Sequence, residues 1–205
     1  MDVIFQILVL IFSVIIHEIS HGYAALLFGD KTAQYEGRLT LNPIKHLDWF
    51  GSIVLPLSLF LLRAPFMIGW AKPVPYNPYN LKNRNMAEPL ISIAGPVSNL
   101  LVATFFGLML RILLSLGYSA SPLINIFGFV VLINVSLAIF NLIPIPPLDG
   151  SKILFAFLPT RAKYTFYNFS EKYGLILILL VVVFLPNFIY PIISSIFHFI
   201  TGIVL

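Results

Sequence analysis

Two histidines and a glutamate with the spacing of a zinc site lie inside a long apolar stretch of this chain. The residues are His17, Glu18 and His21, which match the pattern H-E-x-x-H on a helix. Residues four apart stack on one face of a helix, so both imidazoles can bind the same zinc ion. Glu18 stands beside them, where it can take a proton from water. The pattern therefore predicts a zinc site with Glu18 as base.

The apolar surroundings strengthen this interpretation. A charged side chain within a membrane-spanning helix costs about 2.5 to 3.5 kcal/mol on insertion scales. Three ionisable residues so close together need a compensating interaction, which a metal ion supplies. The alternative is a set of polar groups packed in a bundle interior, or a proton relay.

A catalytic zinc ion keeps three protein ligands and one open position, so a third ligand must come from elsewhere in the chain. Near apolar stretches the candidates are Glu88, Asp149 and His198. Glu88 also suits the start of a helix, where a carboxylate interacts favourably with the helix dipole. His198 also suits a hydrogen-bonded position within the bundle or at the membrane interface.

Asp149 ends an unusual stretch, Asn141-Leu-Ile-Pro-Ile-Pro-Pro-Leu-Asp149-Gly150, in which three prolines interrupt an apolar helix. Broken backbone at membrane depth is tolerated only where it is buried in protein or lines a cavity. An Asp-Gly turn at the surface is the alternative, and it explains the last two residues but not the prolines before them.

The composition indicates which elements must position these residues. The chain has 205 residues, of which 59% are hydrophobic and 10% charged, whereas about a quarter of an ordinary globular chain is charged. The mean hydropathy is +0.97. These values exclude a soluble enzyme, a disordered tail and a nucleic-acid binder, and they predict an all-α polytopic membrane protein. With 0 Cys, disulfides and thiolate metal sites are excluded as well.

Apolar runs of bilayer length predict helices at about 3–28, 88–114, 122–143 and 173–203. The first is expected to be retained rather than cleaved as a signal peptide, because no basic residue precedes it. We expect a single membrane domain over 1–205, with a core at about 3–160 and one or more accessory helices in 173–203. Because Pro186 and Pro191 interrupt that last run, it can form either a kinked span or a helical hairpin.

A more broken run at 51–70 contains Pro56, Arg63 and Pro65, each of which weakens a straight span. We therefore expect a re-entrant or interfacial segment. A segment that dips and returns places the basic residues before and after it on one side of the membrane, which we interpret as cytoplasmic. These residues are Lys31, Arg38, Lys45, Lys72, Lys82 and Arg84, joined by Lys152, Arg161, Lys163 and Lys172 of a later loop.

Three smaller predictions concern polar residues near the membrane. Residues 32–41 mix polar and apolar side chains, which predicts a short β-hairpin at the membrane edge that could pair with an unwound substrate. His46 is interpreted as an interfacial loop residue rather than a ligand. For Asn134, interhelical hydrogen bonding and lining of a water-filled cavity are both open.

Together, these motifs resemble the site-2 protease family of intramembrane zinc metalloproteases. The resemblance covers roughly residues 10–160 and is to small bacterial members without a PDZ domain. It is carried by the zinc motif at His17, by Asn141 to Gly150, by Ile93-Ala-Gly-Pro-Val-Ser-Asn99, and by Gly69-Trp-Ala-Lys-Pro-Val-Pro75. It implies that His17, His21 and Asp149 bind zinc, that Glu18 is the base, and that Asn141 holds the extended backbone of the substrate.

The resemblance implies hydrolysis of a peptide bond within or near a transmembrane segment of a membrane-protein substrate. It also implies one zinc ion per chain and a bacterial or archaeal cell membrane, with the active site toward the cytoplasm. A membrane transporter is the first alternative, because broken helices and intramembrane charges also mark transporters. The second is a catalytically inactive scaffold that binds membrane segments. The complete set of catalytic residue types argues against the scaffold, and the few spans without a repeat argue against the transporter.

Overall fold

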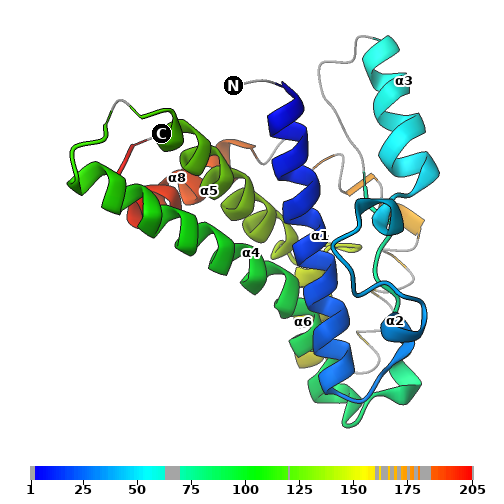
Figure 1. Cartoon of the computed structure of the whole chain (residues 1–205). Helices are drawn as coiled ribbons and strands as arrows, with labels where there is room; N and C mark the ends of the chain where they lie inside the picture. Colours follow the sequence, from blue (N-terminus) through cyan, green and yellow to red (C-terminus); the bar gives the residue numbers. More distant parts are fainter. Residues whose placement is uncertain are drawn as a thin grey trace.

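The computed structural model describes residues 3–62, 70–119, 121–159 and 186–204, with a few isolated positions between 162 and 180. Within these residues the chain is helical and has no β-strand. Three helices are long and apolar enough to cross a membrane, namely α1 (Val3–Leu27), α4 (Arg84–Ser115) and α5 (Pro122–Asn141). The predicted all-α polytopic membrane protein is confirmed (Figure 1).

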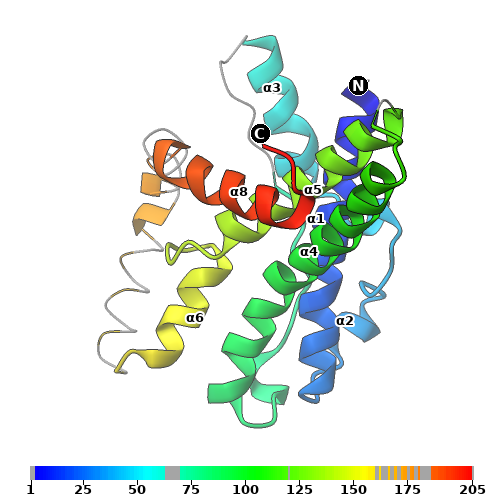
Figure 2. The same ribbon diagram turned by 90° about the vertical axis from the view of Figure 1, so that its left-hand side faces the viewer.

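Helix α4 is the centre of the bundle, because it packs against both α1 and α5. It also contacts α6 (Asp149–Phe157) and α8 (Pro186–Thr201). Figure 2 shows α8 lying across the bundle rather than along it. The connection between α1 and α4 holds the remaining short elements: α2 (Thr32–Tyr35), η1 (Pro43–His46), η2 (Trp49–Val54), α3 (Leu55–Leu61) and η3 (Pro78–Asn80).

Two apolar clusters hold the bundle together. One joins the end of α1 to the start of α4 through Ala25, Leu81, Ala87 and Ile91. The other joins α4, α5 and α8 through Ala103, Val131, Val135 and Phe197. Along α4, the buried polar residues Ser92 and Asn99 lie between the two clusters, and Asn99 contacts His17 of α1.

The proline-rich stretch breaks the helix where the sequence predicts. Helix α5 ends at Asn141 and α6 begins at Asp149, so the three prolines lie in the connection, where their missing N–H groups cost no helical hydrogen bond. A Cβ atom at Gly150 would overlap the carbonyl of Leu142. The chain therefore folds back tightly on the end of α5, and Asp149 is buried.

The predicted β-hairpin at 32–41 is wrong, because Thr32–Tyr35 forms one helical turn. Asp30 accepts hydrogen bonds from the N–H and the hydroxyl of Thr32, at 3.2 and 2.6 Å, and so fixes the start of the turn. Gly37, with φ 62°, closes it in the left-handed conformation that glycine adopts readily. Local hydrogen bonding thus outweighs the mixed pattern that suggested strands.

The two ends of the run 51–70 meet. The N–H of Trp70 donates to the carbonyl of Gly51 at 3.1 Å, and the hydroxyl of Ser52 donates to the carbonyl of Trp70 at 2.8 Å. A segment whose ends lie together returns to the side from which it started, as the re-entrant interpretation requires. Residues 63–69, with Arg63 and Pro65, lie outside the described residues.

Of the predicted accessory run 173–203, the structure describes α8 and a few positions before it. Pro186 is the first residue of α8 and Pro191 lies inside the helix. Arg161, Lys163 and residues 181–185 lie outside the described part of the chain.

Candidate metal centre

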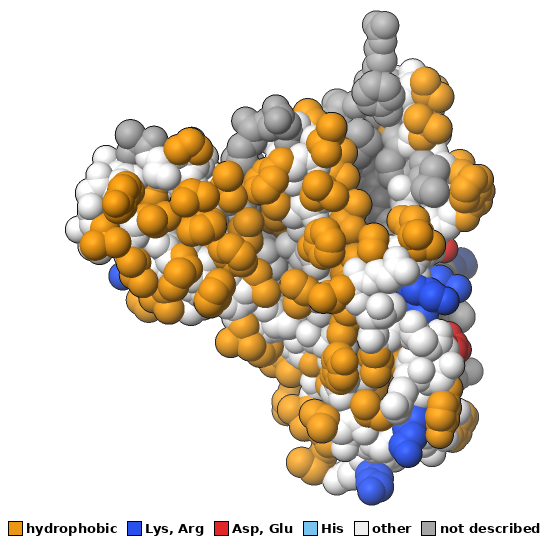
Figure 3. Space-filling view, in the orientation of Figure 1, with side chains coloured by type: hydrophobic (Ala, Val, Ile, Leu, Met, Phe, Trp, Pro, Cys, Tyr) orange, Lys and Arg blue, Asp and Glu red, His pale blue; other side chains and the backbone are white. Residues whose placement is uncertain are grey.

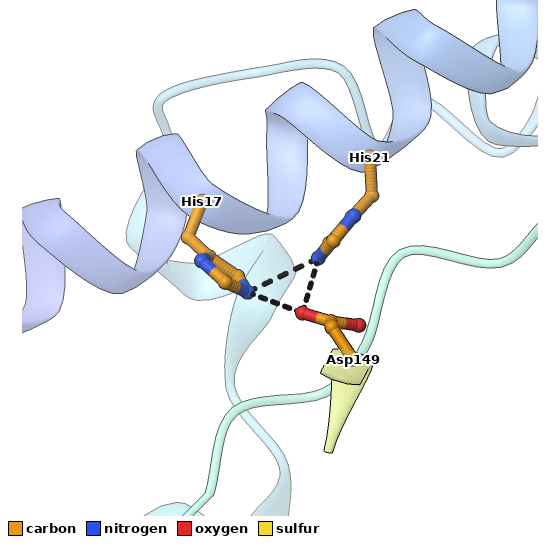
Figure 4. Close-up of side chains that lie close together, drawn as sticks. All are labelled: His17, His21 and Asp149. Carbon is orange, nitrogen blue, oxygen red and sulfur yellow. Dashed lines mark hydrogen bonds and ion pairs between the residues drawn. The ribbon is translucent and has the colours of Figure 1, made fainter. Parts of the chain in front are cut away.

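His17 and His21 of α1 meet Asp149 of α6 (Figure 4). The Oδ2 atom of Asp149 lies 3.1 Å from the Nε2 atom of each histidine. The two Nε2 atoms are 3.0 Å apart. The three side chains are only 7%, 12% and 9% exposed, so water barely competes for them.

A contact on the far side of the ring sets the tautomer of His17. Its Nδ1 lies 2.7 Å from the Oδ1 atom of Asn99. The amide nitrogen of Asn99 donates to the carbonyl of Ser13, which can only accept, so the amide oxygen must face the imidazole. His17 therefore carries its proton on Nδ1 and directs the lone pair of Nε2 toward Asp149.

His21 adopts the same tautomer for a simpler reason. Its Nδ1 lies 2.7 Å from the carbonyl of Ile91, which only accepts hydrogen bonds. When both rings are neutral, two Nε2 lone pairs and one carboxylate oxygen therefore converge, an arrangement that a cation stabilises. Two imidazoles and one carboxylate also match the three-ligand set of a catalytic zinc ion. These three residues therefore fit a zinc ion. Their ligand atoms all lie within 4.8 Å of one another.

Behind His17, three helices share one buried hydrogen-bond network. Asn99 also donates to the Oδ1 atom of Asn134, at 2.9 Å, and Asn134 donates to the hydroxyl of Ser13, at 2.9 Å. Both asparagines are 0% exposed. Interhelical hydrogen bonding is thus the correct interpretation of Asn134. Asn99 and Ser13 were not predicted as site residues, although Asn99 ends the Ala-Gly-Pro segment that signals the family.

Gly95 allows α4 to approach the histidines closely. A Cβ atom there would lie 2.5 Å from the Nε2 atom of His21 and 2.6 Å from that of His17. Glycine inside a helix costs roughly 0.5 to 1 kcal/mol relative to alanine. Its presence here is explained by the imidazoles, which leave no room for a side chain.

Glu18 faces the loop that leads into α4. The N–H of Val74 donates to its Oε2 atom at 2.9 Å, while the other oxygen, Oε1, accepts no hydrogen bond from the residues that the structure describes. Asn141 is the last residue of α5, and its side-chain nitrogen donates to the carbonyl of Leu137 at 2.9 Å.

The other candidate ligands lie elsewhere. Glu88 pairs with Arg84 at 2.7 Å, and His198 is exposed on α8. His46 lies outside the metal group, as predicted, and it is the last residue of η1, where it is 2% exposed. Its Nε2 donates to the carbonyl of Thr40 at 2.8 Å, whereas its Nδ1 is buried without a hydrogen-bond partner among the described residues.

Comparisons with known proteins place the chain in a family. The family model described as "Peptidase family M50" matches residues 113–185, which include Asn141 and Asp149. The chain is 42% identical to YwhC of Bacillus subtilis over 187 residues. The aligned residues cover 87% of this chain and 80% of YwhC. It is 33% identical over 162 residues to MJ0611 of Methanocaldococcus jannaschii, and the aligned residues cover 73% of this chain and 72% of MJ0611.

A third relative, Rip2 of Mycolicibacterium smegmatis, is 30% identical over 145 residues, which are 67% of this chain and 51% of Rip2. All three are named "Putative zinc metalloprotease". No solved structure gives a significant match. The chain belongs to peptidase family M50, the site-2 protease family of membrane zinc metalloproteases.

Proposed function

We propose that this chain is an intramembrane protease that hydrolyses a peptide bond within or near a transmembrane segment of a membrane-protein substrate. The convergence of three lone pairs, from His17, His21 and Asp149, carries the proposal. These residues would hold one zinc ion, which acts as a Lewis acid that lowers the pKa of a water molecule toward 7 and polarises the scissile carbonyl.

Glu18 is the general base and then the general acid. Its carboxylate takes a proton from the water that attacks the scissile carbonyl carbon, and it gives that proton to the amine nitrogen as the C–N bond breaks. The N–H of Val74 occupies Oε2. Oε1 accepts no hydrogen bond from the described residues, and we propose that it is the oxygen that takes up and returns the proton.

The substrate must be unwound at the cleavage site, because a helix keeps its carbonyls in internal hydrogen bonds. Substrate spans are therefore expected to be rich in helix-breaking residues. Asn141 is proposed to bind the unwound backbone. One of its two amide N–H groups donates to the carbonyl of Leu137, which leaves the amide oxygen to accept a substrate N–H and the second N–H to donate to a substrate carbonyl.

The active site is proposed to open toward the cytoplasm. Figure 3 shows hydrophobic side chains over the upper and left parts of the molecule and most of the Lys and Arg side chains toward the lower right. Basic residues mark the cytoplasmic side of membrane proteins. The exposed ones between α1 and α4 are Lys31, Lys45, Lys72 and Lys82, and the exposed Arg84 begins α4. Since relatives occur in Bacillus and Methanocaldococcus, a bacterial or archaeal cell membrane is the expected location.

The substitution Glu18→Gln tests the proposed chemistry in purified protein with a model transmembrane substrate. It removes the base but none of the three ligands, so cleavage should be abolished and zinc retained. Cleavage that survives the substitution would refute the assigned base. A wild type that moves metal across vesicles without cleaving would favour a transporter, and one that captures membrane segments intact would favour an inactive scaffold.

A further inference from the structure

A buried arginine lies outside the metal centre without an acidic partner. Arg38 is 4% exposed, and no carboxylate pairs with it among the described residues. Its Nε atom is buried without a hydrogen-bond partner in the same part of the chain. Burying a charge in this way is costly, so the contacts that Arg38 does make need an explanation.

Those contacts hold a short piece of backbone that we call the strap, residues 72–74. The Nη2 atom of Arg38 donates to the carbonyl of Lys72 at 2.7 Å and to the carbonyl of Pro73 at 3.1 Å. The N–H of Lys72 donates to the carbonyl of His46 at 2.8 Å. The strap is thus anchored by a charged side chain and by the backbone of a neighbouring loop.

The third residue of the strap reaches the catalytic carboxylate. Val74 donates its N–H to Oε2 of Glu18 at 2.9 Å. Its side chain is 6% exposed and lies on α1 at Gly22, where a Cβ atom would come within 2.8 Å of Cγ1 of Val74. Gly22 follows Glu18 by four residues and shares its helix face. The strap therefore lies directly over the part of α1 that presents Glu18.

We propose that Arg38 is a positioning residue for the protease reaction. By holding the two carbonyls of the strap, it aims the N–H of Val74 at Glu18 and fixes the orientation of the carboxylate. The inference rests on the proposed role of Glu18 as base. Because a misplacement of about 1 Å can cost about 100-fold in rate at an active site, loss of this anchor lowers catalysis without removing any ligand or reacting group.

The first test measures the position of the strap without using activity. The chain has 0 Cys, so Val74→Cys adds a single thiol at a buried position. A water-soluble maleimide should label this thiol slowly in the otherwise wild-type protein and at least tenfold faster when Arg38→Ala is added. Ala103→Cys, at a core residue that is 0% exposed, should stay protected in both backgrounds. Equal labelling rates at Val74→Cys with and without Arg38 would overturn the proposal.

The second test separates positioning from folding and from metal binding. Arg38→Ala should lower kcat at least tenfold, with KM and zinc per chain within twofold of the wild type. Arg38→Lys keeps a cationic donor and should recover part of kcat, and added guanidinium ion should partly rescue Arg38→Ala. Arg84→Ala is the matched control, because Arg84 is an exposed arginine that pairs with Glu88, and it should leave kcat unchanged.

Two outcomes of the kinetic test contradict the inference, namely an unchanged kcat in Arg38→Ala or a parallel loss of zinc and kcat. A wild type that cleaves no substrate would instead sink the proposed function. Labelling would still show in that case whether Arg38 holds the strap, so the two failures are distinguishable.

Discussion

The Nδ1 atom of His17 and the Oδ1 atom of Asn99 lie 2.7 Å apart, and this contact decides which nitrogen of the imidazole faces Asp149. The two residues come from α1 and α4. Partners of this kind orient metal-binding histidines and raise their basicity. The bundle thus does more than bring the candidate ligands together, because it also orients the lone pair that would bind a metal.

Asn99→Ala is expected to weaken zinc binding about 10- to 100-fold, because His17 loses the acceptor that fixes its tautomer. Competition with a chelator of known affinity measures the change in purified protein. Thr104→Ala on the same helix is the control, since its hydroxyl bonds only to the carbonyl of Leu100. Equal zinc affinity in Asn99→Ala and the wild type would show that the contact does not tune the site.

Gly95→Ala is expected to abolish zinc binding. The added methyl group would lie 2.5 to 2.6 Å from the Nε2 atoms of His21 and His17, which must then move. Gly128→Ala in α5 is the control, because its nearest neighbour would be 3.8 Å away and the protein should keep its zinc. Metal analysis of both proteins decides, and full zinc occupancy in Gly95→Ala would contradict the geometry of the site.

Asp30 should make the stability of the protein depend on pH in the acid range. Burial alone would raise the pKa of this carboxyl, but hydrogen bonds from Thr32, Asn80 and the N–H of Asn77 lower it below its ordinary value. Since the folded pKa is the lower one, the stabilisation is complete above about pH 4 and is lost as the pH falls toward the folded pKa.

Asp30→Asn is therefore expected to lower stability at pH 7 by about 1 to 3 kcal/mol, because a charged acceptor of several hydrogen bonds is removed. The pH dependence of stability below about pH 4 should also become flatter. Unfolding midpoints at pH 7 and in mild acid measure both effects, with Glu36→Gln at an exposed position as control. A variant with the same midpoints and the same slope as the wild type would refute this role.

The grouping of His17, His21 and Asp149 could be predicted from the sequence because most of the information is local, with the family resemblance selecting Asp149 among three candidates. His17 and His21 share a helix face, and the prolines before Asp149 mark a break that any spanning helix would avoid. Asn99 and Arg38 could not be assigned in this way, since Asn99 acts on a residue 82 positions away and Arg38 acts on carbonyls 34 and 35 positions away. Their roles exist only once the helices and loops have packed.

The β-hairpin predicted at 32–41 is wrong for a related reason. The local pattern of polar and apolar residues does not show that Asp30 packs against the loop before α4. Asp30 is 1% exposed, and it accepts hydrogen bonds from Thr32, the N–H of Asn77 and the side chain of Asn80. This buried carboxylate ties the turn after α1 to the loop before α4. The mixed polarity of the segment reflects that packing and not strand alternation.

The most direct test of the metal centre is the amount of zinc per chain in detergent-purified protein, compared among wild type, Asp149→Ala and Glu88→Ala. The expected result is about one zinc per chain in the wild type and in Glu88→Ala, and much less in Asp149→Ala. A well-folded wild type without zinc, or an Asp149→Ala variant that keeps a full equivalent, would contradict it.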